Sequence, residues 1–391
     1  MISCRPCLVD AQQFQDLAPL LAQWKAARPS MGVLVLLAEA NQSSIPALQK
    51  AFRQAGLPMV GAVFPALVTD QGFASTGAWL LCFDEMPPWF LVEDLNGGAE
   101  SAAGRIAALL PETGGVVAAE ASTELLFLIF DGLIPNIASI LDGLWVKARN
   151  GVRYCGVNAG SETFQPMPCL FDCTRNVGNG VIGLRLPAAA RAVVRHGYPV
   201  AATVMHATSS EGNRIDRIDY RPAMEVYREV ILAEYGVTLT NENFYDYAVH
   251  YPFGVVALLD VLVRIPVGFS EDGAIFCVGE IPPNSALRLL RAPAAEDRGC
   301  VEMLVEAVWT KEEERGVPPL LTFYCAGRRM HFGEAAALEL SMLKTRTGAG
   351  GVAGALTLGE IDTHSDLGIP RFHNASVVCL PGLACSTCGT A

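Results

Sequence analysis

The fold is decided by the stretch Met31–Val63, MGVLVLLAEANQSSIPALQKAFRQAGLPMVGAV. It begins with Met31–Leu37, a short continuous apolar run rich in Val and Leu, which is typical of a strand buried on both faces. The middle of the stretch has apolar residues at helical spacing, and Met59–Val63 returns as a second apolar run. The pattern predicts a strand–helix–strand unit.

The same pattern recurs twice further along the chain. The second copy has a strand, a helix and a strand over Leu125–Phe130, Ile134–Lys147 and Val152–Val157. The third copy has them over Leu320–Cys325, Glu334–Lys344 and Val352–Leu358. Sequence identity between the copies is negligible, so the pattern indicates shared organisation and does not prove a duplication. Strands and helices mixed in this way predict an α/β (α+β) fold of layered, mixed β-sheets covered by helices.

The chain is long enough for two domains. Its 391 residues exceed one average domain. The break is expected near Tyr220-Arg221-Pro222, where a predicted strand gives way to a helix over Ala223–Tyr235 that Gly236 ends. We therefore expect two layered halves, 1–219 and 220–391.

Composition indicates a well-packed, soluble protein. Hydrophobic residues make up 51% of the chain and charged residues 17%, which rules out a disordered chain. The most apolar stretches, Leu125–Phe130 and Phe253–Val263, are interrupted by Asp131, Asp260 and Arg264 well short of a membrane-spanning length. The N-terminus shows no secretory pattern, so we expect a cytoplasmic protein.

The net charge argues against two classes of partner. It is −12 at pH 7, and the sequence pI is about 5.0. An acidic surface repels phosphate backbones and anionic lipid headgroups, so neither nucleic acid nor a membrane surface is expected as a partner.

Six short segments carry a family resemblance. They are His196–Pro199, Glu211–Ile215 and Tyr220–Tyr227 in the first part of the chain, and Cys325–Arg328, Gly359–Ile361 and His373–Ser376 in the second. Their order and spacing resemble those of the FIST sensory proteins, with an N-terminal and a C-terminal FIST half. The resemblance extends over most of the chain, from about Met31 to Leu380. It implies a sensor without catalytic activity that binds a small molecule, such as an amino acid, and signals to a partner.

Four further segments resemble one branch of that family. They are Gly61–Pro65, Asp131–Leu133, Asn158–Ser161 and Pro168–Phe171. These segments are similar to the NosP-type branch, described as haem-dependent nitric-oxide sensors. The resemblance implies a gaseous ligand, haem as a cofactor and a histidine kinase as the partner. More distant FIST proteins carry Gly-Cys-Ser-Thr where this chain has Gly61–Phe64.

The resemblance also singles out side chains. Arg328, Glu360, His373 and Asn374 match the polar set of the family, in which Arg328 would hold a ligand carboxylate and Glu360 an ammonium. The alternative is a structural network between loops. His196 matches the His-Gly-aromatic segment of the branch and is the candidate axial haem ligand, or else a hydrogen-bonded structural histidine. No Cys-x-x-Cys-His attachment motif is present, so haem would be non-covalent.

The two ends of the chain suggest a metal site. Two of the 12 cysteines form a Cys-x-x-Cys pair near the N-terminus, Cys4 and Cys7, and two form another near the C-terminus, Cys385 and Cys388. Four thiolates can hold a zinc ion or an iron–sulfur cluster. Two unrelated reduced pairs or a redox-active disulfide are the alternatives.

Other functions have weaker support. A thiol- or metal-dependent enzyme would use Cys325 or the terminal cysteines, and a zinc-stapled structural protein would use the terminal cysteines alone. The glycine-rich stretch Gly348–Gly354 lacks the Lys-Ser/Thr ending of a phosphate-binding loop, and no Gly-x-Ser-x-Gly nucleophile motif is present.

Overall fold

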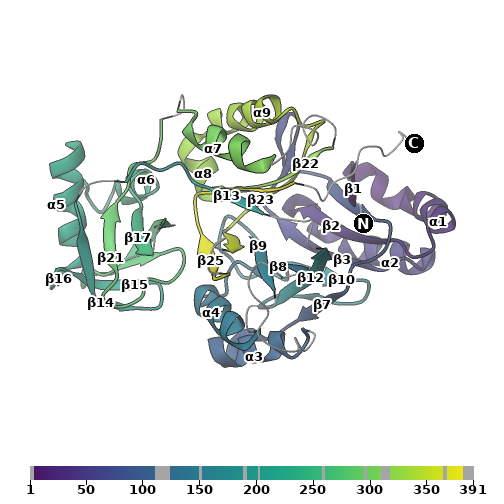
Figure 1. Ribbon diagram of the computed structural model, residues 1–391, viewed down its shortest axis with the longest axis horizontal. Coiled ribbons are helices and arrows are strands. Elements are labelled where there is room, and N and C mark those ends of the chain that lie inside the picture. Colours follow the sequence, from purple (N-terminus) through teal and green to yellow (C-terminus); the bar gives the residue numbers. More distant parts are fainter. Residues whose placement is uncertain are drawn as a thin grey trace.

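A computed structural model describes residues 4–110, 124–148, 152–187, 192–200, 203–257, 260–294, 297–309, 318–363 and 368–381. Strand pairing divides these residues into a body of three repeats and a fourth part, the insert, that projects from it (Figure 1). Mixed sheets and covering helices confirm the predicted α/β fold.

The three repeats follow one order of elements: strand, helix, strand, helix, strand, hairpin, strand. Repeat 1 consists of β1 (Cys4–Val9), α1 (Leu17–Ala27), β2 (Gly32–Ala38), α2 (Ile45–Ala55), β3 (Met59–Phe64), the hairpin β4 (Leu67–Thr69) and β5 (Gly72–Ala74), and β6 (Ala78–Phe83). Repeat 2 consists of β7 (Trp89–Val92), α3 (Ala99–Ala107), β8 (Glu124–Asp131), α4 (Ile137–Ala148), β9 (Arg153–Ala159), the hairpin β10 (Leu170–Asp172) and β11 (Asn176–Val177), and β12 (Val181–Pro187).

Repeat 3 is interrupted by the insert after its first strand. It consists of β13 (Val193–Arg195), then α7 (Gly299–Val308), β22 (Leu320–Cys325), α8 (Ala326–Phe332), α9 (Ala335–Thr347), β23 (Val352–Thr357), the hairpin β24 (Glu360–Thr363) and β25 (Pro370–His373), and β26 (Val377–Leu380). Helix α8 begins directly after Cys325, a helix that the sequence pattern did not indicate.

The predicted strand–helix–strand units are confirmed in all three repeats. β2 pairs with β3, β8 with β9 and β22 with β23, and each pair is parallel. Parallel neighbours need a crossover connection, which the intervening helix supplies. All residues of β2 and β22 are buried, as their continuous apolar runs indicate.

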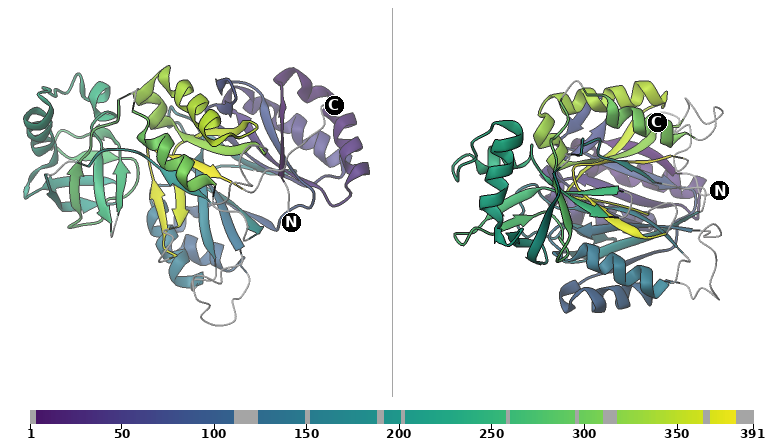
Figure 2. Two further views of the ribbon diagram at one scale, coloured as in Figure 1. Left: turned by 45° about the horizontal axis from the view of Figure 1, so that its top comes forward. Right: turned by 60° about the vertical axis from the view of Figure 1, so that its left-hand side comes forward.

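The repeats exchange their hairpins in a ring. The hairpin of repeat 1 joins the sheet of repeat 3 through β4 and β23. The hairpin of repeat 2 joins repeat 1 through β10 and β3, and the hairpin of repeat 3 joins repeat 2 through β24 and β9. The helices of the repeats therefore lie on three sides of the body (Figures 1 and 2). Because each six-stranded sheet needs a neighbour's hairpin, we expect the body to fold as one unit.

The common core lies where the three sheets meet. Central strands of every repeat contribute three apolar side chains each to one cluster: Leu34, Leu81 and Phe83; Phe127, Leu184 and Leu186; and Leu321, Phe323 and Leu380. They surround a residual space of about 10 Å³, too small to bind a ligand. The centre of the body is therefore structural.

The insert has its own sheet and its own core (Figure 1). It consists of β14 (Met205–Glu211), β15 (Arg214–Ile218), β16 (Arg221–Pro222), α5 (Ala223–Tyr235), α6 (Phe244–Ala248), β17 (Phe253–Ala257), β18 (Asp260–Arg264), β19 (Pro266–Phe269), β20 (Ile275–Cys277) and β21 (Ala286–Leu289). Helix α5 has the predicted bounds, and Gly236 ends it in a left-handed conformation at φ 68°.

The expected boundary at residues 219 and 220 lies inside this insert. It falls in the turn between β15 and β16, which pair antiparallel with Ile218 opposite Arg221. The strand-to-helix transition that suggested a boundary is thus local to one sheet. Strand pairing also separates the described chain at the two ends of the insert, near residues 200 and 292.

Candidate functional site

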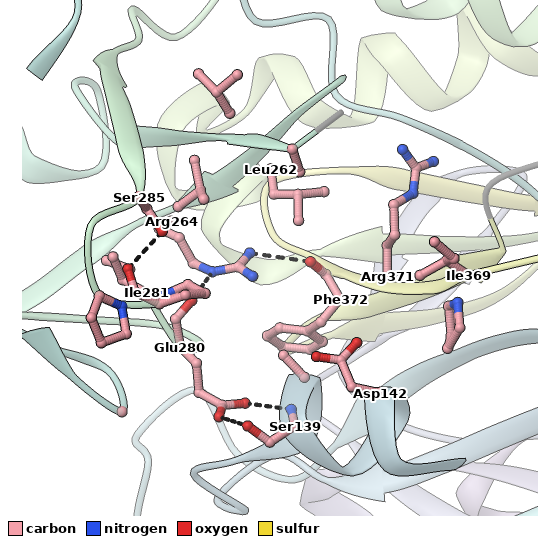
Figure 3. A pocket seen from close by; sticks show the side chains of 18 residues that line it. Ser139, Asp142, Leu262, Arg264, Glu280, Ile281, Ser285, Ile369, Arg371 and Phe372 are labelled. Carbon is pink, nitrogen blue, oxygen red and sulfur yellow. Dashed lines mark hydrogen bonds between the residues drawn. The ribbon is translucent and has the colours of Figure 1, made fainter. Parts of the chain in front are cut away.

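A cavity of about 550 Å³ lies where the insert meets the body. The insert contributes residues of β17, β18 and the segment before β21, and the body contributes residues of α4 and β25. Figure 3 shows the polar side chains that line it: Ser139, Asp142, Arg264, Glu280, Ser285 and Arg371. Cavities between parts of a protein are preferred ligand sites.

Arg264, the last residue of β18, is the main charged group of the cavity wall. It is only 2% exposed. Its Nε donates to the Glu280 carbonyl at 2.9 Å, and its Nη1 donates to the carbonyls of Val263 at 3.0 Å and Phe372 at 3.1 Å (Figure 3). The guanidinium carbon lies 5.6 Å from the ring centre of Phe372. All three hydrogen bonds thus go to neutral acceptors.

Arg264 has no counter-ion within the described part of the chain. No ion pair there includes it, and its Nη2 forms no hydrogen bond with a described residue. Burial lowers the pKa of Arg264 to about 10, and the more distant Cys277 and Glu280 offset this only in part. A buried cation without a charged partner is costly, so an anion bound next to it would be strongly stabilised.

Arg371 differs from Arg264 although it lines the same cavity. Its Nε and Nη2 form a two-bond contact with the Asp362 carboxylate at 3.0 and 2.9 Å. Its Nη1 donates to Asp260 of the insert at 2.6 Å. The charge of Arg371 is therefore compensated by the protein, and Arg371 also ties the insert to the body.

The opposite side of the cavity is acidic. The Glu280 carboxylate accepts hydrogen bonds from the backbone N–H of Ser139, at 2.9 Å, and from the Ser139 hydroxyl, in the first turn of α4. Partial burial and the neighbouring charge of Glu280 raise the pKa of Asp142. Two carboxylates close together favour a cation between them. Within the described residues, the cavity therefore combines a guanidinium that forms no ion pair with two carboxyl groups.

The structure brings the predicted polar set together behind this cavity. Glu360 of β24 lies directly opposite His373 of β25, and Asn374 follows. Nη1 of Arg328 donates to the Ala375 carbonyl at 3.2 Å. The four residues are neighbours, as the family resemblance implies.

Arg328, however, is fully occupied by protein groups. It is 0% exposed, and its Nε and Nη2 donate to the two oxygens of Glu339 at 2.7 and 2.6 Å. The Tyr324 hydroxyl donates to the same carboxylate at 2.6 Å. Burial alone would lower the pKa of Arg328, but the surrounding acidic groups, with Glu339 in contact, hold it well above its ordinary value. This geometry is that of a structural ion pair.

Glu360 and His373 also have protein partners. Glu360 accepts hydrogen bonds from the hydroxyls of Thr357 at 2.6 Å and Ser376 at 2.7 Å. Burial raises its pKa to about 7, although these bonds favour the charged form. His373 Nε2 lies 2.8 Å from the Asp362 carboxylate. In the same set, Asn374 has a buried side-chain oxygen without a hydrogen-bond partner among the described residues.

The ring of His196 forms a hydrogen bond within the protein. Its Nδ1 accepts the backbone N–H of Tyr198 at 2.9 Å. Burial, followed by the charge of His373, lowers its pKa to about 4, while Asp260 acts in the opposite direction. The Nδ1 lone pair is therefore used within the protein, and the role of His196 as an axial haem ligand stays a prediction.

The terminal cysteines are described only in part. In β1, Cys4 lies opposite Phe83 and Cys7 opposite Leu80 of β6. Residues three apart in a strand point to opposite faces, so within β1 these two side chains are directed away from each other. Cys4 is completely buried, and burial raises its pKa. Cys385 and Cys388 lie outside the described residues, so the four-thiolate site stays a prediction.

Within the described ranges, no cluster of three or more His, Cys, Asp or Glu side chains could hold a metal ion. Nor does any described helix have the length and apolarity to cross a membrane.

Arg264 was not predicted as a candidate site residue, although the sequence contains a signal that it could be one. Arg264 directly follows the apolar run Phe253–Val263. A charged residue at the end of a buried strand is rarely fully buried unless it has a partner or a ligand. The run folds into a hairpin, in which β17 pairs antiparallel with β18, the strand that ends at Arg264.

These features define a class: an α/β protein of three hairpin-exchanging repeats with an inserted domain and a small-ligand cavity between the two. The model of the FIST N domain matches residues 33–221, and that of the FIST C domain matches residues 223–362. The chain belongs to the FIST-domain proteins, whose domains are sensory and bind small ligands. The two matches meet at the sequence position expected for the boundary, inside the insert. No curated protein sequence matches the chain.

Proposed function

We propose that this protein is a sensor for a small zwitterion of the amino-acid type, bound in the cavity between the insert and the body. The observation that carries the proposal is Arg264, a buried guanidinium in the cavity wall whose hydrogen bonds to described residues all go to backbone carbonyls. A ligand carboxylate beside it would replace the missing counter-ion with a charge-assisted hydrogen bond.

The carboxyl groups of the cavity support the proposal that the ligand also carries an ammonium group. Asp142 and Glu280 line the cavity together with Arg264. A ligand ammonium between these carboxylates would relieve the repulsion that contributes to the raised pKa of Asp142. A free carboxylic acid without an amino group would use only the Arg264 side.

The signal would arise because the ligand touches both parts of the protein. Arg264 and Glu280 belong to the insert, whereas Asp142 belongs to α4 of the body. A ligand that binds better when the two parts are close shifts the population towards that arrangement. The changed surface would then be recognised by a signalling partner, for which the family resemblance suggests a histidine kinase.

The gas-sensing interpretation depends on the NosP-type resemblance. It proposes haem or an iron–sulfur cluster as the nitric-oxide-reactive centre. His196 would hold the haem iron through the ring nitrogen that does not accept the Tyr198 N–H. The terminal cysteines would hold the cluster, and an absorption spectrum with metal analysis of anaerobically purified protein tests both.

A ligand screen tests the zwitterion proposal. The intact protein is heated with each member of a panel of amino acids, and with the matching amino-acid amides and N-acetyl derivatives. A true ligand should raise the melting temperature, because binding to the native state stabilises it by mass action. The amide lacks the carboxylate for Arg264, and the N-acetyl form lacks the ammonium for Asp142, so both should bind more weakly. A panel with no stabilising member, or equal effects of acid and amide, would refute the proposal.

A further inference from the structure

A second cavity lies close to the ends of the strands that bear Arg264 and Phe372. Its volume is about 270 Å³. Ile265, the neighbour of Arg264, lines it, as does Asn374, two residues after Phe372. The remaining wall is largely apolar and again comes from both parts of the protein, with Val249 and Val278 from the insert and Leu358 from the body among them.

Asn374 gives this cavity an unused hydrogen-bond acceptor. The residue is 1% exposed, and its Nδ2 donates to the His373 carbonyl at 2.9 Å. Its Oδ1 is buried and has no hydrogen-bond partner in the part of the chain that the structure describes. Burying a polar atom without a partner costs free energy, so native proteins rarely leave one unless a ligand or water satisfies it.

The mouth of the cavity is apolar and exposed. Phe164 and Met330 of the body are 44% and 62% exposed, and Tyr245 and Val267 of the insert are 63% and 39% exposed. All four line the cavity. Apolar side chains that are exposed and clustered around one opening are typical of a binding site.

The other polar groups of the cavity leave no charge for a ligand. Glu162 forms an ion pair with Arg329 at 2.6 Å. The Cys325 sulfur accepts the backbone N–H of Ala375 at 3.1 Å, and burial raises the pKa of this thiol, so it stays neutral. The occupant that matches the wall is therefore uncharged.

We propose that this cavity is a second ligand site, for a small neutral molecule with an apolar body and one N–H or O–H group that donates to Asn374 Oδ1. The volume admits roughly ten non-hydrogen atoms, at about 30 Å³ for each displaced water. The site is independent of the zwitterion cavity, because neither Arg264 nor Asp142 lines it. An occupant would contact both the insert and the body.

Indole and 1-methylindole are the matched probes, since they share an aromatic body and differ in the N–H donor. Titration calorimetry of the intact protein should show indole binding about tenfold more tightly, the usual worth of one buried hydrogen bond. In Asn374→Leu the two probes should bind equally. In Val278→Phe, which fills the cavity from the insert side, both should bind at least tenfold more weakly. Leu338→Phe adds the same ring at an exposed position of α9 and should change nothing.

Three results would overturn the proposal. They are no binding of either probe at millimolar concentration, equal affinities of the two probes for the parent protein, or unchanged indole affinity in Val278→Phe. Circular dichroism confirms that each variant is folded, and if Asn374→Leu is not, Val278→Phe alone decides. Arg264→Gln should leave indole binding unchanged, so failure here is distinguishable from failure of the zwitterion proposal.

Discussion

Two arginines of this protein are equally buried and have opposite surroundings. Arg328 lies in repeat 3 of the body and is held by both oxygens of Glu339. Arg264 lies in the insert at its junction with the body, and its hydrogen bonds go to three carbonyl oxygens. When a buried cation contacts a protein carboxylate, its charge is compensated within the protein. The charge of a buried cation without such a carboxylate can be compensated by the anionic group of a ligand. We therefore propose Arg264 as the binding arginine and Arg328 as a structural one, although only Arg328 belongs to the family motif.

Replacing Arg328 should have the largest effect. In Arg328→Met, Glu339 would remain buried without its counter-charge, and such a change costs about 3–5 kcal/mol of unfolding free energy. Denaturant unfolding followed by circular dichroism measures this loss. The double variant Arg328→Met/Glu339→Met should recover most of it, because it removes both charges. A loss below about 1 kcal/mol, together with weaker ligand binding, would instead make Arg328 the binding arginine.

Acid should destabilise the region around Arg328 through His196, whose carbonyl accepts a hydrogen bond from Arg328 Nη1 at 2.6 Å. The folded-state pKa of His196, about 4, lies below the ordinary 6.5, so the unfolded chain binds the proton first. Stability from this group is therefore complete above pH 6.5 and is lost as the pH falls towards 4, by about 3 kcal/mol. His196→Gln should lose less stability than the parent over this window. Parallel pH profiles of the two would contradict the assignment.

Glu360 should produce the opposite pH dependence in the same region. Its folded-state pKa is raised from 4.5 to about 7. The folded chain therefore holds the proton more tightly, and stability from this group is complete below pH 4.5 and is lost as the pH rises through 7, by about 3 kcal/mol. Glu360→Gln should gain stability relative to the parent between these pH values. The same denaturant series measures it, and a constant difference across the window would refute the raised pKa.

Removing the Ser139 hydroxyl should have only a small effect on the free energy of unfolding. Ser139→Ala removes the hydroxyl that donates to Glu280 but keeps the backbone N–H bond. The loss should be about 0.5–1.5 kcal/mol, the net value of one hydrogen bond. Thr345→Ala removes a bond within α9, from its hydroxyl to the Ser341 carbonyl, and serves as the control. Ser139→Ala should also weaken zwitterion binding slightly, which Thr345→Ala should not.

The sequence predicts the strand–helix–strand units well because their signal is local. The run Leu320–Cys325 is apolar throughout, and a fully buried parallel strand requires that. The exchange of hairpins could not be predicted, since β4 pairs with β23 from a distant part of the sequence and short strands carry little pattern. The boundary expected near residue 220 agrees with the place where the two family matches meet, whereas strand pairing also links the residues on its two sides, because a strand-to-helix transition can occur within one sheet.

The candidate site, too, could be predicted from the sequence only where the signal is local. The motif residues Glu360 and His373 are adjacent in the structure, as their shared motif implies. Whether a side chain is open to a ligand depends on its partners from distant segments. Glu339 occupies Arg328 from α9, and nothing comparable reaches Arg264 among the residues described. Neither of these two differences can be predicted from the spacing of residues in the sequence.

The central claim is that Arg264 binds the carboxylate of the ligand. Calorimetric titration of the parent protein and of Arg264→Gln, with the best amino acid from the screen and with its amide, tests it most directly. Arg221→Gln, at an exposed arginine of the insert, is the control. We predict that Arg264→Gln binds the amino acid about 100-fold more weakly, as expected for a lost charge-assisted bond, and no longer distinguishes it from the amide. Parent-like affinity in Arg264→Gln, with the preference for the carboxylate intact, would contradict the account.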